Sequence, residues 1–235
     1  MIHPIRLYGD PVLRRSAAPV DRFDDDLARL ADEMIETMHD ANGVGLAGPQ
    51  IGVSKRIFVA AELAPPSPGE SRLAGDESAG DEIVGGERDA DDDADDDADA
   101  DDDSDDDGPE VLALHVMVNP AIVERRGVQI APDGCLSVPG VWVEEMERDA
   151  AVRVRFQDLA GAWHERDVSG HFAHVVQHEL DHLDGIFYFD RLPADTRRAF
   201  LEDHRTELAE LQRRAKAFLR ELRAPDRAPA DTARR

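Results

Sequence analysis

Hydrophobic positions along this chain of 235 residues follow a helical period in some segments and a strand pattern in others. From about Asp24 to Met38, apolar side chains recur at helical spacing, which predicts an amphipathic helix. They are Leu27, Leu30, Met34, Ile35 and Met38. Six short segments have the composition and flanking turns of strands. They are residues 56–60, 112–118, 121–125, 142–147, 152–157 and 163–168.

The second half of the chain predicts a hairpin followed by two helices. Leu159-Ala160-Gly161 has the composition of a turn between the last two strands. Residues 170–183 are expected to form a helix that ends near Gly185. A last helix over residues 194–222 would carry Phe200, Leu208, Leu211, Phe218 and Leu222 on one side. Residues 223–235, rich in Pro, Ala and Arg, are expected to be loose.

The acidic residues of the chain are concentrated in one segment. Residues 61–110 hold 22 of the 52 acidic residues but only 2 of the 27 basic ones. From Asp89 to Asp107 the sequence is nearly all Asp and Ala, and such dense like charge cannot bury a core. We therefore expect a disordered insertion, more simply a solvated loop than a partner-binding or cation-binding element.

The domain organisation follows from this insertion. Residues 1–60 and 111–192 would form one folded domain of about 140 residues, enough for a real core. Residues 193–235 would add a C-terminal helix and tail. No N-terminal apolar run resembles a signal peptide, and no segment is long enough to span a membrane. The expectation is a cytoplasmic protein without a membrane partner.

Two histidines four residues apart are the most informative feature of the chain. In Gln177-His178-Glu179-Leu180-Asp181-His182, both rings can reach one metal ion from one helix face. Glu179 points about 100° away, where it can act on water at the metal without binding the ion. A polar helix with a chance histidine pair is the competing interpretation. The largely apolar segments on both sides indicate a buried helix and argue against it.

The single cysteine, Cys135, offers a third ligand. It follows a glycine in Asp133-Gly134-Cys135-Leu136-Ser137, and a lone cysteine is most often a small buried hydrophobe. With His178 and His182 it would complete a three-ligand catalytic site that keeps one position open. One thiolate and two imidazoles suit Zn²⁺, Fe²⁺, Co²⁺ or Ni²⁺. The predicted fold class is α+β, with mostly antiparallel sheets packed around this metal-binding helix and a C-terminal helix beyond it.

A glycine-rich segment contributes a second candidate element. Gly43, Gly45 and Gly48, followed by Pro49, are expected to exclude a regular helix or strand. A phosphate-binding loop is the competing interpretation, but no lysine follows and no serine or threonine closes the motif. A loop that holds a peptide backbone fits better.

Three motifs in this order resemble those of the peptide deformylase family. They are Gly43-Val44-Gly45-Leu46-Ala47-Gly48-Pro49-Gln50, Asp133-Gly134-Cys135-Leu136-Ser137 and Gln177-His178-Glu179-Leu180-Asp181-His182. The opening Ile5-Arg6-Leu7-Tyr8-Gly9-Asp10-Pro11-Val12-Leu13-Arg14 is also similar to the start of a family member. The resemblance covers roughly residues 2–60 and 111–192.

The resemblance implies a metal-dependent hydrolase that removes the formyl group from the N-terminal methionine of nascent polypeptides and releases formate. Glu179 would transfer the proton, while the Gln50 amide and the backbone N–H of Leu136 would stabilise the oxyanion. Ferrous iron is the implied metal in the cell, and Zn²⁺, Ni²⁺ or Co²⁺ can replace it. Formyl-methionyl nascent peptides are the implied partners, with the ribosome as a further candidate and no direct nucleic-acid binding.

The substrate-binding residues form the least specific part of this interpretation. The resemblance makes Gly45 a backbone contact to the peptide, with Val44 beside it. His174 precedes His178 by four residues, but three such positions span about 12 Å, too far for one ion. We expect His174 and Val175 to line the edge of the methionine pocket instead, although a plain packed histidine is an equal alternative for His174.

Three departures from the family pattern alter the surroundings of the site. Asp133 stands where the cysteine motif usually begins with glutamate, and Gly48 stands where a second alanine is common. Trp142, followed by Glu144-Glu145, occupies a segment in which many members carry an arginine. We therefore expect a rearranged buried ion pair at Asp133 and a changed rim of the substrate site. Two other functions stay open: a zinc protease with a distant third ligand, and a catalytically silent protein that binds ribosomes or nascent chains.

Overall fold

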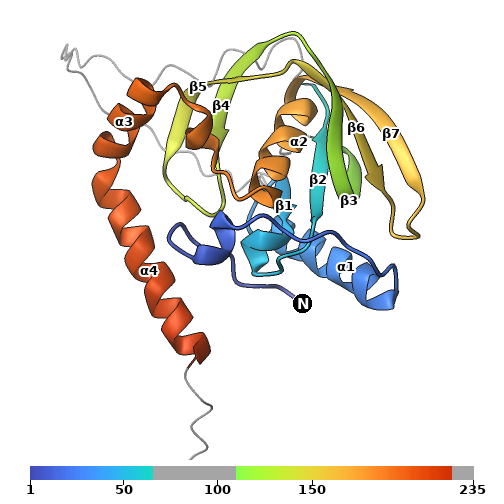
Figure 1. The fold of residues 1–235 in the computed structure, drawn as a ribbon, viewed down its shortest axis with the longest axis horizontal. Helices are drawn as coiled ribbons and strands as arrows, with labels where there is room; N and C mark the ends of the chain where they lie inside the picture. Colours follow the sequence, from blue (N-terminus) through green and yellow to red (C-terminus); the bar gives the residue numbers. More distant parts are fainter. Residues whose placement is uncertain (66–109, 224–235) are drawn as a thin grey trace, which may run out of the picture.

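The computed structural model describes residues 1–65 and 110–223. Two antiparallel sheets lie on either side of one central helix, α2 (Gly170–Leu183), as Figure 1 shows. The larger sheet has the strand order β1-β2-β3-β6-β7, and the smaller pairs β4 with β5. The predicted α+β class is confirmed. The strands are β1 (Gly45–Ala47), β2 (Ile57–Leu63), β3 (Val111–Arg126), β4 (Gln129–Gly134), β5 (Trp142–Arg148), β6 (Ala151–Gln157) and β7 (Trp163–Ser169).

Helix α1 (Asp25–Asp40) forms where the amphipathic stripe predicts it and ends two residues later. The side chain of Asp24 accepts a hydrogen bond from the N–H of Leu27 and caps the first turn. Asp25 and Asp26 place negative charge at the positive end of the helix dipole. The buried face packs beneath β1 and β2 and includes Leu27, Ala31, Met34 and Met38.

The two strands predicted at 112–118 and 121–125 are one long strand, β3. The pairing register with β6 shifts between Val118 and Ala121, where Pro120 has no N–H to donate to the ladder. Asn119 takes a left-handed conformation at φ 51°. Its side chain accepts a hydrogen bond from the N–H of Val20 at 2.8 Å, which anchors the irregularity to the N-terminal segment. A local break in pattern is therefore a bulge and not a chain reversal.

The glycine-rich segment is more regular than expected. Gly45 to Ala47 forms β1, paired with β2, and Gly48 to Ile51 forms a short 3₁₀ helix. The prediction of an irregular loop is wrong. These glycines are needed because neighbouring atoms leave no room for a Cβ, and not because the backbone takes unusual dihedral angles. A Cβ on Gly48 would lie 2.8 Å from the carbonyl oxygen of Val53. Strand β4 was not predicted either, since Pro132, Asp133 and Gly134 are poor strand formers.

The acidic insertion joins two neighbouring antiparallel strands. Leu63 of β2 pairs with Val111 of β3, and the N–H of Ala64 donates to the carbonyl of Glu110 at 2.8 Å. Residues 61–63 therefore belong to β2, and the predicted boundary at residue 61 is too early. The expected disorder of the insertion falls on residues 66–109, which lie outside the described residues, as does the expected loose tail from residue 224.

The single C-terminal helix predicted over 194–222 is two helices, α3 (Ala194–Asp203) and α4 (Arg205–Arg223), which meet at His204. The break lets the two helices bury different side chains. Phe200 of α3 packs against the aromatic 3₁₀ turn Tyr188–Arg191, whereas α4 buries Leu208, Leu211 and Ala215. Leu222 is exposed and does not belong to a buried stripe.

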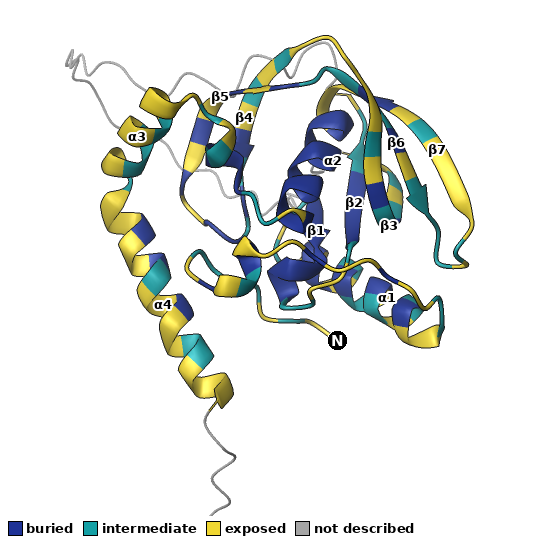
Figure 2. Ribbon diagram, in the orientation of Figure 1, coloured by how far each residue is buried: buried dark blue, intermediate teal, exposed yellow. Residues whose placement is uncertain are grey.

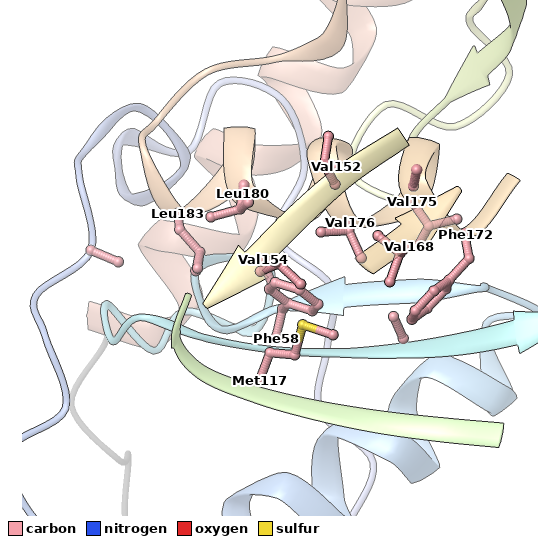
Figure 3. Packing of buried hydrophobic residues seen from close by; sticks show 14 residues of the cluster. Phe58, Met117, Val152, Val154, Val168, Phe172, Val175, Val176, Leu180 and Leu183 are labelled. Atoms are coloured by element: carbon pink, nitrogen blue, oxygen red, sulfur yellow. The ribbon is translucent and has the colours of Figure 1, made fainter. Parts of the chain in front are cut away.

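Helix α2 is buried along nearly its whole length, from Phe172 to Leu183 (Figure 2). One face packs on the larger sheet through Phe172, Val176 and Leu183, which meet Phe58 and Val154 (Figure 3). Burial of such side chains stabilises the domain by about 1.5–3 kcal/mol each. Within the described residues, no helix is long and apolar enough to cross a membrane.

Candidate active site

Helix α2 presents its polar face away from the larger sheet. His174, His178 and His182 recur at four-residue intervals on this face, and all three are buried. The helix ends in the region predicted, because Gly185 takes a left-handed conformation at φ 76°. Gly185 also lies so close to Arg14 that a Cβ would be 2.8 Å from its backbone.

Cys135 reaches the two histidines from the loop that follows β4. Its Sγ lies 3.1 Å from Nε2 of His182. One ligand atom each from Cys135, His178 and His182 fall within 4.8 Å of one another. Among the described residues, this is the one group of His, Cys, Asp and Glu side chains with that geometry. A thiol and two imidazoles, buried and converging, fit a divalent transition metal with an open position.

Asp133 holds the first of the histidines. Its Oδ1 lies 2.7 Å from Nδ1 of His178, so the ring turns its Nε2 towards the other ligands. Burial acts to raise the pKa of Asp133, but the neighbouring His178, His174 and Arg148 hold that pKa well below its usual range. Burial lowers the pKa of His182, which favours the neutral ring that a metal requires.

A chain of buried charges continues behind Asp133. Arg148 donates to Asp133 Oδ2 from Nε at 2.9 Å and to Asp181 Oδ2 at 2.9 Å. Arg191 then contacts Asp181 Oδ1. Neither Arg148 nor Asp181 is predicted as a functional residue from the motifs. Asp181 sits inside the histidine motif on a buried helix, and that position was the available signal, since a buried carboxylate needs a partner.

Glu179 is buried and lies opposite the glycine of β1. Burial raises the pKa of Glu179 to about 7. A Cβ on Gly45 would lie 2.4 Å from Glu179 Oε1, closer than any real contact. Glycine at position 45 therefore makes room for the carboxylate, and this explains the motif better than loop flexibility does.

Gln50 is fully buried, so its amide needs partners inside the protein. Its Oε1 accepts a hydrogen bond from the N–H of Ala47 at 2.7 Å. This bond directs Nε2 towards Ser137 Oγ at 3.4 Å and Cys135 Sγ at 3.7 Å. Leu136 follows Cys135, and its side chain approaches Gly43, where a Cβ would lie 2.7 Å from Leu136 Cδ1.

A cavity of about 480 Å³ brings the predicted residues together. No lysine or arginine lines it among the described residues. Of the candidates, all except His182 line its wall: Val44, Gly45, Gln50, Cys135, Leu136, His174, Val175, His178 and Glu179. Most of the remaining wall is apolar or glycine, which is typical of a ligand site with a few converging polar groups.

His174 stands apart from the three candidate ligands. Its Nε2 lies 3.1 Å from Asp133 Oδ2, yet neither ring nitrogen makes a well-directed hydrogen bond within the described residues. The group of atoms able to hold an ion does not include it. Its predicted place at the edge of a substrate pocket stays a prediction.

A buried Cys-His-His group beside a glutamate, at the base of an apolar cavity in an α+β domain, defines a class of metal-dependent hydrolases. The family model of polypeptide deformylases matches residues 2–198. The chain therefore belongs to the peptide deformylase family, as its three motifs predicted. Members of this family are metal-dependent hydrolases that remove the N-formyl group from nascent polypeptides.

Individual relatives agree with this assignment. A peptide deformylase of Thermus thermophilus is 44% identical over 222 residues, covering 94% of this chain and 98% of the relative. One of Acidobacterium capsulatum is 35% identical, covering 83% and 88%. A crystal structure of peptide deformylase from Thermus thermophilus superposes with a TM-score of 0.68 at 40% identity, covering 91% and 99%. Neither the protease nor the catalytically silent alternative fits this membership.

Proposed function

We propose that this chain hydrolyses N-formyl-methionyl peptides at the Cys135–His178–His182 centre, with Glu179 as the proton carrier. The observation that carries the proposal is the convergence of these groups and Gln50 at one apolar cavity. A divalent ion held by the three ligands would act as a Lewis acid and lower the pKa of water towards neutrality.

Glu179 would accept the proton of the attacking water and return it to the leaving amine. Burial raises the pKa of Glu179, and a pKa raised towards neutrality suits both roles, because efficient acid–base catalysts titrate near the working pH. Oxygen from water joins the formyl carbon, the carbon–nitrogen bond breaks, and formate leaves while the amine gains the proton. Gly45 leaves space for the carboxylate and offers its backbone to the peptide.

Gln50 and Leu136 would stabilise the oxyanion of the tetrahedral intermediate. The hydrogen bond from Ala47 to Gln50 Oε1 fixes the amide with its donor group towards Cys135. The backbone N–H of Leu136 follows directly after the Cys135 ligand. Preorganised donors of this kind each contribute about 2.7–4 kcal/mol to transition-state stabilisation.

Val44, His174 and Val175 would line the pocket for the methionine side chain. All three border the cavity, and His174 is the one polar member. His174→Ala is expected to keep its metal and to raise KM more than it lowers kcat. Loss of metal comparable with that of His178→Ala would contradict this role.

We further propose Fe²⁺ as the metal in the cell, with Zn²⁺, Ni²⁺ or Co²⁺ as replacements, and action in the cytoplasm on chains emerging from the ribosome. The thiolate of Cys135 beside an open position would make an iron site sensitive to oxidation.

The deciding experiment is formate release from a formyl-methionyl peptide by iron-loaded protein under anaerobic conditions. X-ray absorption is expected to show one sulfur in the first shell, and Cys135→Ser to weaken or change metal binding. A shell of nitrogen and oxygen alone, or the absence of formate from fully loaded protein, would overturn the proposal. Co-sedimentation with ribosomes tests the location separately.

A further inference from the structure

Trp142 stands exposed at the mouth of the cavity. It is the first residue of β5 and pairs with Gly134 of β4. Its relative exposure is 58%, although a large aromatic side chain is normally mostly buried. It lines the same cavity as Cys135 and Glu179. An exposed aromatic beside a reaction centre offers contact area that the protein itself does not use.

The indole ring is held in place by the glycine opposite it. A Cβ on Gly134 would lie 2.1 Å from Trp142 Cε3 and 2.8 Å from Cδ2, so one part of the ring covers the Gly134 backbone. Any other residue at position 134 would displace the ring. Because the ring already rests on the backbone before Cys135, a ligand would not have to order it on binding.

The neighbouring wall is suited to an apolar side chain. Pro132, Pro139 and Gly140 border the same cavity as Trp142, and none of these offers a side-chain hydrogen bond. Further along β5, Glu144 is exposed and lies two residues from Trp142. This combination favours an apolar group and disfavours a carboxylate.

The chemistry of an extended peptide determines which substrate residue can reach this ring. Successive side chains of an extended chain point to opposite sides, about 3.3 Å apart along the backbone. If the methionine side chain enters the cavity, the next side chain points outwards, towards the rim above Cys135.

We propose that Trp142 is a specificity-determining residue that receives the side chain following the formyl-methionine and favours aliphatic or aromatic residues there. The inference rests on the proposed function. The contact would be made on the free part of the ring, and it would lower KM for peptides with an apolar second residue while leaving the proton transfer at Glu179 unchanged.

The first test compares kcat/KM for formyl-Met-Leu-Ser, formyl-Met-Ala-Ser and formyl-Met-Asp-Ser. Trp142→Ala is expected to reduce the Leu-to-Ala preference about three- to ten-fold, mainly through KM, with metal content unchanged. Trp142→Phe should keep most of it. Trp163→Ala is the matched control, because Trp163 is similarly exposed at 52% but stacks with Arg155 on β6 and does not line the cavity.

An equal loss on all three peptides, or an unchanged preference, would overturn the inference. Failure of the wild type to release formate from any peptide would instead contradict the proposed function. A binding measurement tests the inference about Trp142 independently of catalysis. The chain has two tryptophans, so Trp163→Phe leaves Trp142 as the one fluorophore of its kind. Its emission should shift on adding Met-Leu-Ser more than on adding Met-Ala-Ser, and no difference between the peptides would contradict the proposal.

Discussion

Among the described residues, two cavities border helix α2, and the candidate catalytic groups line the smaller of them. The larger, of about 640 Å³, lies against β3 and the turn between β5 and β6. The smaller, of about 480 Å³, is lined by Cys135, His178 and Glu179. Charged residues line much of the larger one: Arg56, Arg125, Arg148, Arg191, Glu147, Asp149, Asp181 and Asp184.

The two cavities differ in whether their polar groups already have partners. In the larger, Arg56 contacts Asp184 at 2.7 Å, and Arg148 contacts Asp181 at 2.9 Å. In the smaller, Oε2 of Glu179 has no hydrogen-bond partner within the described residues, and burial raises the pKa of this carboxyl to about 7. A functional site is better recognised by unpaired polar groups facing apolar space than by volume.

The largest expected effect comes from removing the carboxylate of the smaller cavity. Glu179→Gln should lower kcat by about 10²–10⁴ while the metal stays bound, because the amide cannot carry the proton. Glu147→Gln, which borders the larger cavity, is the matched control and should keep wild-type turnover. Full activity of Glu179→Gln at full metal occupancy would contradict the mechanism. A comparable loss of kcat in Glu147→Gln would show that the two cavities do not differ in function.

The buried charges between the two cavities can be tested by measuring the free energy of unfolding. Arg148→Met leaves Asp133 and Asp181 charged, buried and without this guanidinium, so the free energy of unfolding should fall by about 3–5 kcal/mol. Arg125→Met removes an exposed pair with Asp149 and should cost at most about 1 kcal/mol. Urea unfolding of the metal-loaded proteins measures both. Equal losses of unfolding free energy in the two variants would show that the buried ion pairs stabilise the protein no more than the exposed pair does.

The raised pKa of Glu179 also predicts a pH-dependent cost in the metal-free protein. Burial raises this pKa from 4.5 to about 7, so the stability that the protonated carboxyl contributes is lost as the pH rises through 7. Without metal, the free energy of unfolding of Glu179→Gln should therefore rise relative to that of the wild type between pH 5 and pH 8. The expected rise is up to about 3 kcal/mol. Urea unfolding of both proteins at the two pH values measures this gain. A constant difference between them would argue against a protonated Glu179.

Removal of the acidic insertion should have the smallest effect. Ala64 and Glu110 already meet across the strand ends, so replacing residues 66–109 by a short glycine-rich turn should leave Tm within a few degrees and kcat/KM unchanged. Deleting residues 61–112 instead would remove the paired ends of β2 and β3 and should destabilise the protein. A large loss of Tm or kcat/KM on replacing residues 66–109 would show that the insertion supports one of the cavities.

Elements governed by local pattern could be predicted from sequence. Helices α1 and α2 and the β6–β7 hairpin follow the predictions within about two residues, because an amphipathic period and a glycine turn are properties of neighbouring residues. The pairing of His178 and His182, with Glu179 between them, could be predicted for the same reason, since a helix turn places the two rings together wherever that helix lies.

The tertiary structure decided what depends on partners distant in sequence. It joined two predicted strands through the Asn119 bulge, made β1 and β4 from glycine- and proline-containing segments, and divided the last helix at His204. It also connected Asp133 of β4 to Arg148 of β5 and to Asp181 of α2. A single sequence does not show which buried charges will face one another, because that pairing is determined only when the core brings separate elements into contact.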